Sequence, residues 1–126
     1  MKTPLVLEPR IVKKPWGEEM IFAETARYAG KLITIRAGQS LSYQYHNRKE
    51  ETVHVLNGRL GLEVEREGFR ETLRLSPGET FHIHPLTKHR MFAETEDCLI
   101  VEVSSPELDD VVRLEDRYGR QGTTAP

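Results

Sequence analysis

The strongest constraint on the fold is a period-two alternation of apolar and polar residues, repeated in short runs that turn residues separate. Such alternation sorts the side chains of an extended strand onto two faces. Gly- or Pro-containing turns, such as Asn57-Gly58 and Ser76-Pro77-Gly78, end the runs. Many short strands at regular spacing predict an all-β sandwich or barrel. The predicted strands are 18–24, 31–36, 41–46, 52–56, 60–66, 69–75, 80–84, 90–95 and 99–104.

The chain of 126 residues has the length of a single domain, and we expect one domain over residues 1–126. Residues 105–117 have room for a helical turn or two, around residues 107–114. The tail, residues 121–126, is expected to be disordered.

Composition excludes several classes of partner. Lys and Arg number 18 against 20 Asp and Glu, a net charge of −2, so we expect neither nucleic acid nor an anionic membrane surface as a partner.

The N-terminus lacks the apolar core of a signal peptide and no run is long enough to span a membrane, so we expect a cytoplasmic protein. Cys98 is the one cysteine; it lies in the apolar run CLIVEV, where a buried hydrophobic role is expected.

Polar residues in the stretch SYQYHNRKEETVHVLNG, residues 42–58, indicate a metal site. Alternation puts Gln44 and His46 on one side of their strand, where they can chelate side by side. Glu51 shares its face with Val53 and Val55, so it is expected to point into an apolar interior. An unpaired carboxylate is costly there, and a bound cation removes that cost. On spacing alone, a hairpin with exposed polar residues is an equal alternative.

A fourth ligand is expected from the run FHIHPLTKHR, which offers His82, His84 and His89. We favour His89, because a Pro-containing loop fixes its direction, whereas the strand that carries the other two could face either way. Two imidazoles, a carboxylate and an amide oxygen suit Zn²⁺, Mn²⁺, Fe²⁺, Co²⁺ or Ni²⁺.

Two spaced motifs resemble those of the cupin superfamily: Gly38-x7-His46-x4-Glu51-x6-Gly58 and Gly78-x10-His89. Nearly the whole chain resembles, more closely, the cupin domain of type II mannose-6-phosphate (phosphomannose) isomerases. Four segments carry this resemblance: KPWG at 14–17, RAGQSLSYQYHNRKEE at 36–51, KHR at 88–90 and DDVVRLEDRYGR at 109–120. It implies a small jelly-roll barrel, or double-stranded β-helix.

The resemblance also implies one divalent metal, zinc first, with Gln44, His46, Glu51 and His89 as its ligands. This chain departs from the family pattern at two places, which bear on the identity of the metal and on the fit of the substrate. The family has three histidines where this chain has one, in His46-Asn47-Arg48, and His84 replaces an expected proline. The nucleotidyltransferase part of fused family members has no counterpart in this sequence, so we expect no synthesis of GDP-mannose.

By resemblance, the expected reaction is the interconversion of mannose 6-phosphate and fructose 6-phosphate through an enediol. That reaction needs a Lewis acid, a base and a clamp for the phosphate. Glu102 matches a family glutamate and is the candidate base. Lys31, which shares a face with inward apolar residues, is a candidate for catalysis or phosphate binding. Arg90 and Arg113 match further family positions for the sugar phosphate, although alternation points Arg90 away from the metal.

Two alternative functions remain open at this stage. One is a cupin enzyme that acts on another sugar or a small acid, as an epimerase or dioxygenase; the other is a non-enzymatic cupin that binds a metal or small ligand. The sequence also indicates a homodimer, because Leu41, Tyr43 and Tyr45 would form an apolar outer face.

Overall fold

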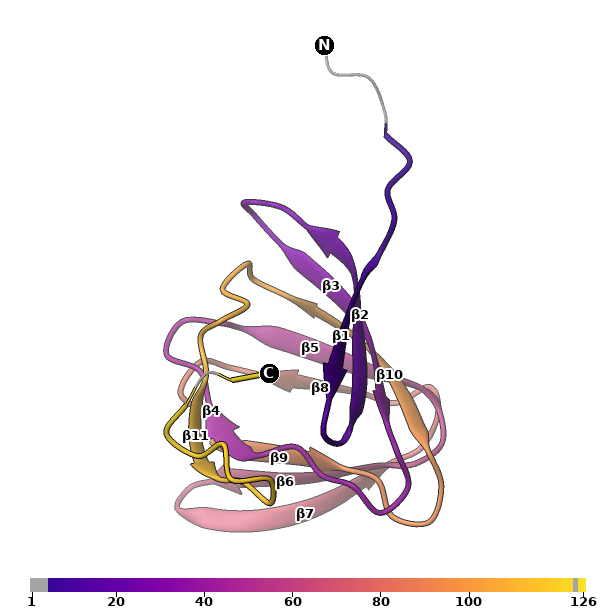
Figure 1. Ribbon diagram of the computed structural model, residues 1–126. Helices are drawn as coiled ribbons and strands as arrows, with labels where there is room; N and C mark the ends of the chain where they lie inside the picture. Colours follow the sequence, from indigo (N-terminus) through magenta and orange to yellow (C-terminus); the bar gives the residue numbers. More distant parts are fainter. Residues whose placement is uncertain (1–4, 124) are drawn as a thin grey trace.

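Two antiparallel sheets make up the fold in the computed structural model, which describes residues 5–123 and 125–126 (Figure 1). The six-stranded sheet has the order β1-β2-β3-β10-β5-β8, and the five-stranded sheet has the order β11-β4-β9-β6-β7. The strands are β1 (Arg10–Lys14), β2 (Gly17–Glu24), β3 (Ala29–Ile35), β4 (Tyr43–Tyr45), β5 (Glu51–Asn57), β6 (Leu60–Arg66), β7 (Phe69–Leu75), β8 (Thr80–Ile83), β9 (His89–Phe92), β10 (Cys98–Ser104) and β11 (Val112–Glu115).

Alternation along the strands builds the core between the sheets. In β5, Glu51, Val53 and Val55 are buried while the residues between them are partly exposed, as the sequence predicts. From the facing sheet, Leu62 and Val64 of β6 complete the same apolar cluster. The all-β sandwich or barrel is therefore confirmed, and Cys98 is buried within it, where burial and then Glu96 raise the pKa of its thiol to about 11.

Two strands, β1 and β11, were not predicted from the sequence. The prediction of a helical turn around residues 107–114 is wrong. β1 forms a hairpin with β2, and Lys14 pairs with Gly17 across its turn. β11 pairs with β4, so Val112 lies opposite Tyr45, about 70 positions earlier in the chain. Both are short edge strands, and each forms only by pairing with its one neighbouring strand.

The apolar outer face expected for residues 41–45 is also wrong. Leu41 precedes the three-residue strand β4 and packs in the core, because alternation does not extend beyond the strand. Tyr43 is 5% exposed: the guanidinium of Arg70 stacks 3.7 Å from its ring centroid, and its hydroxyl donates to Glu65 at 3.2 Å. The basis for the predicted homodimer is thereby removed, and the dimer itself stays a prediction.

Part of the tail expected to be disordered is hydrogen-bonded to the fold. Gly122 N donates to Arg113 O at 3.1 Å, and the Arg113 guanidinium donates to Thr123 O at 3.0 Å. Thr124 lies outside the described residues. No helix within residues 5–123 and 125–126 has the length and apolarity needed to cross a membrane.

The Asn57-Gly58 turn gives a test of how closely the turn between β5 and β6 packs against the segment before β10. Gly58 has a φ of +75°, and an added Cβ would lie 2.2 Å from Asp97 O. We predict that Gly58→Ala lowers the free energy of unfolding by about 3 kcal/mol, from backbone strain plus steric overlap. Gly68 is the matched control, because its φ is +81° but no atom lies within 4 Å of an added Cβ. Gly68→Ala should cost about 1 kcal/mol. Urea unfolding of both variants checks this, and equal losses would contradict it.

Candidate metal centre

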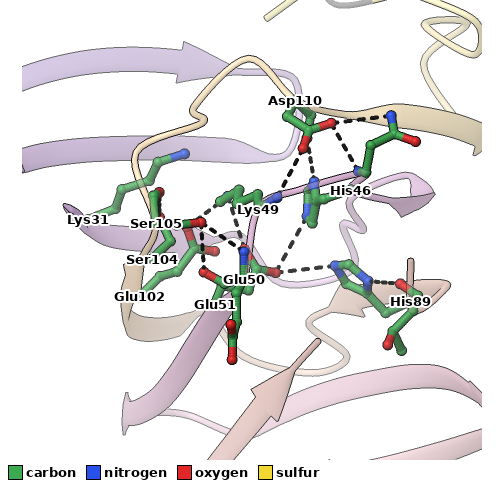
Figure 2. A network of polar contacts seen from close by, with 12 residues as sticks. Lys31, His46, Lys49, Glu50, Glu51, His89, Glu102, Ser104, Ser105 and Asp110 are labelled. Carbon is green, nitrogen blue, oxygen red and sulfur yellow. Dashed lines mark hydrogen bonds and ion pairs between the residues drawn. The ribbon is translucent and has the colours of Figure 1, made fainter. Parts of the chain in front are cut away.

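Three buried side chains from separate elements converge on one point. His46 follows β4, Glu51 begins β5 and His89 begins β9. Glu51 Oε1 lies 3.6 Å from His46 Nε2 and 3.3 Å from His89 Nε2, and the three residues are between 1% and 5% exposed. Figure 2 shows both imidazoles directed toward this carboxylate. Their donor atoms lie within 4.8 Å of one another, close enough to share one cation.

Backbone carbonyls fix the protonation of the two imidazoles. His46 Nδ1–H donates to Asp110 O at 2.6 Å, and His89 Nδ1–H donates to Thr87 O at 2.8 Å. A carbonyl can only accept, so in each neutral ring the lone pair is on Nε2, toward the Glu51 carboxylate. His89 Nε2 is buried without a hydrogen-bond partner in the described chain. Two lone pairs directed at a carboxylate repel it, and a cation among them turns this repulsion into attraction. These residues therefore fit a divalent metal.

Gln44 lies at the same cavity as the three residues. It pairs with His89 between β4 and β9, and its side chain lines the cavity with His46 and Glu51. The structure thus brings together all four residues that were predicted as ligands. The other two candidates are both exposed, His82 on β8 and His84 directly after it.

A buried ion network that the sequence did not predict lies beside the centre. Lys49 Nζ is 2.9 Å from Glu51 Oε2 and 3.2 Å from Glu102 Oε2 (Figure 2). Burial raises the pKa of Glu102, and the Glu51 carboxylate raises it further. Burial alone would raise the pKa of Glu51, but the Lys49 ammonium holds it well below its usual range. Glu51 is therefore the permanent anion, and Glu102 is the carboxyl group that takes up a proton more readily.

Cations line the rest of the cavity. Lys31 is 6% exposed and lies 3.3 Å from Glu19, while Lys14 is 3.9 Å from the same carboxylate. Arg113 and Arg120 line the cavity from the C-terminal segment. Arg120 pairs with Asp116, but Arg113 forms no ion pair within the described part of the chain. Burial and then the nearby Arg120 lower the pKa of Arg113.

Arg90 is not part of this cavity. Its guanidinium lies 3.2 Å from Glu115 and 3.9 Å from Glu63, on the other face of the five-stranded sheet. Alternation from His89 predicts this direction correctly. Because Arg90 points away from the cavity, it is not placed to bind a substrate there.

Asp110 holds the hairpin that carries His46 and Lys49. Its carboxylate accepts backbone N–H groups at residues 47, 48 and 49, at 3.0, 2.6 and 3.0 Å. Its own carbonyl accepts from His46, so this residue positions both the backbone and the ring. No pattern in the sequence predicts this role, because the contact spans more than 60 residues.

Comparison with known protein families assigns the chain to one of them. The family model described as mannose-6-phosphate isomerase C-terminal matches residues 6–116. The chain belongs to this family. Mannose-1-phosphate guanylyltransferase ManC of Salmonella typhimurium is 34% identical over 116 residues, 88% of this chain and 23% of ManC. The chain spans about a quarter of the length of the curated relatives it matches.

Solved structures of the cupin type share the fold. KdgF from Halomonas sp. has a TM-score of 0.67 at 26% identity, over 82% of this chain and 89% of KdgF. A Bacillus subtilis oxalate decarboxylase, described with Mn(II) centers, has a TM-score of 0.71 at 18% identity, over 86% of this chain and 30% of the decarboxylase. The predicted cupin, double-stranded β-helix fold is therefore confirmed.

The role of Asp110 leads to a pH-dependent prediction for this family member. Burial alone would raise the pKa of Asp110, but the backbone N–H groups outweigh it and lower the pKa to about 2. The unfolded value is about 3.9, so the stabilisation is complete above pH ~5 and is lost as the pH falls toward 2. At pH 7 we predict that Asp110→Ala loses about 2 kcal/mol of unfolding free energy.

The exposed neighbour Asp109 provides the control, and Asp109→Ala should change stability by less than about 0.5 kcal/mol. Urea unfolding at pH 7 and pH 3 measures both variants. If Asp110→Ala lowers the free energy of unfolding by the same amount at pH 7 and at pH 3, the carboxylate does not act through its charge.

Proposed function

We propose that this chain is a metal-dependent sugar-phosphate isomerase that interconverts mannose 6-phosphate and fructose 6-phosphate. The observation that carries the proposal is a buried His46–Glu51–His89 cluster that shares one cavity with Glu102, Lys31 and Arg113. Membership of the mannose-6-phosphate isomerase C-terminal family supports the choice of substrate.

The metal would be held by His46, Glu51 and His89, with Gln44 beside them; we expect zinc, with manganese, iron, cobalt or nickel as alternatives. A divalent cation there supplies Lewis acidity toward the oxygens on C1 and C2 of the sugar. The cluster fits such an ion because its Nε2 lone pairs and carboxylate share one centre.

Glu102 is the proposed base. Isomerisation removes the proton from C2 of the aldose and returns one to C1, while a proton moves from the oxygen on C2 to the oxygen on C1. A carboxyl group with a raised pKa suits both removal and return, because it exchanges its proton closer to neutral pH. Lys49 lies 3.2 Å from Glu102 and stabilises its charged form. Lys31 lines the same cavity and can donate to a sugar oxygen.

The phosphate group is proposed to bind among Lys14, Lys31 and Arg113. These three residues line the cavity and an adjoining surface groove, so they lie between the metal centre and solvent. Glu19 is the shared carboxylate neighbour of Lys14 and Lys31, and a phosphate dianion would balance the remaining positive charge. The C-terminal segment supplies Arg113, which gives the segment a role in substrate binding.

The first experiment assays mannose 6-phosphate isomerisation with metal-stripped and zinc-reloaded protein. We expect activity after reloading, loss of the zinc at the buried centre in Glu51→Gln, and a kcat lowered at least about 10²-fold in Glu102→Gln, which should keep that zinc. Reloaded protein that holds zinc at the buried centre but does not interconvert the two sugars would refute the isomerase and leave the metal centre standing.

A second prediction separates the two arginines. Arg113→Gln should raise the KM for mannose 6-phosphate at least about tenfold, the loss expected for one charge-assisted hydrogen bond. Arg90→Gln is the matched control: it removes the same charge from the opposite face of the sheet and should leave KM within about twofold. Steady-state kinetics decide, with thermal unfolding to verify both folds. Equal effects on KM would exclude a specific phosphate contact.

A further inference from the structure

A second cluster of metal-binding side chains lies on the outer surface of the six-stranded sheet. Glu50 Oε2 is 2.6 Å from His82 Nε2 and 3.9 Å from His84 Nδ1. The two imidazole rings meet edge to face with their centroids 4.6 Å apart. The three donor atoms lie within 4.8 Å of one another, as in the buried centre.

Strand pairing explains why these residues meet. β5 and β8 pair with Glu51 opposite Ile83 and Thr52 opposite His82. Extending this register by one residue puts Glu50 across from His84. Side chains alternate along a strand, so Glu50 points outward where Glu51 points inward. The cluster therefore lies behind the buried centre and shares no ligand with it.

We propose that Glu50, His82 and His84 bind a divalent transition-metal ion at the surface, independently of the buried centre. Two imidazole nitrogens and one carboxylate oxygen form a set that favours Zn²⁺, Ni²⁺ or Cu²⁺ over Mg²⁺ or Ca²⁺. Water completes the coordination on the solvent side. The site depends on neither the isomerase activity nor its substrate.

The contact distances are compatible with such a site after a small movement. Tetrahedral zinc with bonds of about 2.0–2.1 Å separates its ligand atoms by about 3.3 Å. The 2.6 Å contact between Glu50 and His82 must therefore lengthen by about 0.7 Å, as the metal replaces the proton between them. The Glu50 and His84 side chains are 49% and 76% exposed, so they are free to rotate.

Thr52 orients the central ligand. Its Oγ1 lies 2.7 Å from His82 Nδ1 and can accept the proton on that nitrogen. The lone pair is then on Nε2, toward Glu50. A hydroxyl in this position acts on the imidazole as the backbone carbonyls do at the buried centre.

Calorimetric titration of the untagged, metal-stripped chain with Zn²⁺ tests the proposal. We expect two binding events per chain, the weaker at the surface. His84→Ala and His82→Ala should each weaken that event at least tenfold and leave the other unchanged. Glu51→Gln should abolish the buried event and keep the surface one. None of these measurements requires activity.

His54 provides a matched control, because it lies on the same face of β5 but bonds Thr80 at 2.7 Å, outside the cluster. His54→Ala should retain both events. A wild-type chain that binds zinc at the buried centre alone, a loss in His54→Ala equal to that in His84→Ala, or loss of both events in Glu51→Gln would each overturn the proposal. The ligand side chains are exposed, so their removal should not unfold the protein, and circular dichroism verifies this.

Discussion

The organisation of this domain depends on one buried carboxylate. Glu51 is 2% exposed and faces two imidazoles whose Nδ1 protons are committed to backbone carbonyls. A buried anion beside two lone pairs is unfavourable unless a positive charge lies among them. The three residues come from two sheets, β5 in one and β4 and β9 in the other, so the same centre also joins the sheets at one end of the fold.

The surrounding charges fit that requirement. Lys49 bridges Glu51 and Glu102, so its ammonium partly compensates both buried carboxylates. The chain as a whole is nearly neutral, yet Lys14, Lys31, Arg113 and Arg120 all line one cavity. Attraction for an anionic ligand is thus a local property, produced where the N-terminal hairpin and the C-terminal segment meet over the barrel. The near-neutral composition predicts this arrangement, because any binding of an anionic substrate then has to come from a few placed cations rather than from the total charge.

Much of the fold could be predicted from the sequence, because alternation is a local property. Alternation correctly predicted that Glu51 points inward and Arg90 outward, and the loop before His89 indicated the histidine that lies beside Glu51. It failed where structure depends on distant partners. β11 becomes a strand only by pairing with β4, and Asp110 acts on residues more than 60 positions away.

Lys49 was missed for a related reason. It lies in the turn before β5, where alternation has no meaning, and a charged residue in a polar hairpin gives no sign of burial. The face assigned to Leu41 was wrong because β4 is only three residues long. The burial and direction of side chains in short strands and turns are therefore what the sequence predicts least well in such a barrel.

Anomalous diffraction from crystals of the zinc-reloaded protein would locate the ion. We expect it inside the barrel, about 2.0–2.2 Å from His46 Nε2, His89 Nε2 and a Glu51 carboxylate oxygen. A barrel interior without an anomalous peak, in protein that binds zinc only at its surface, would contradict it.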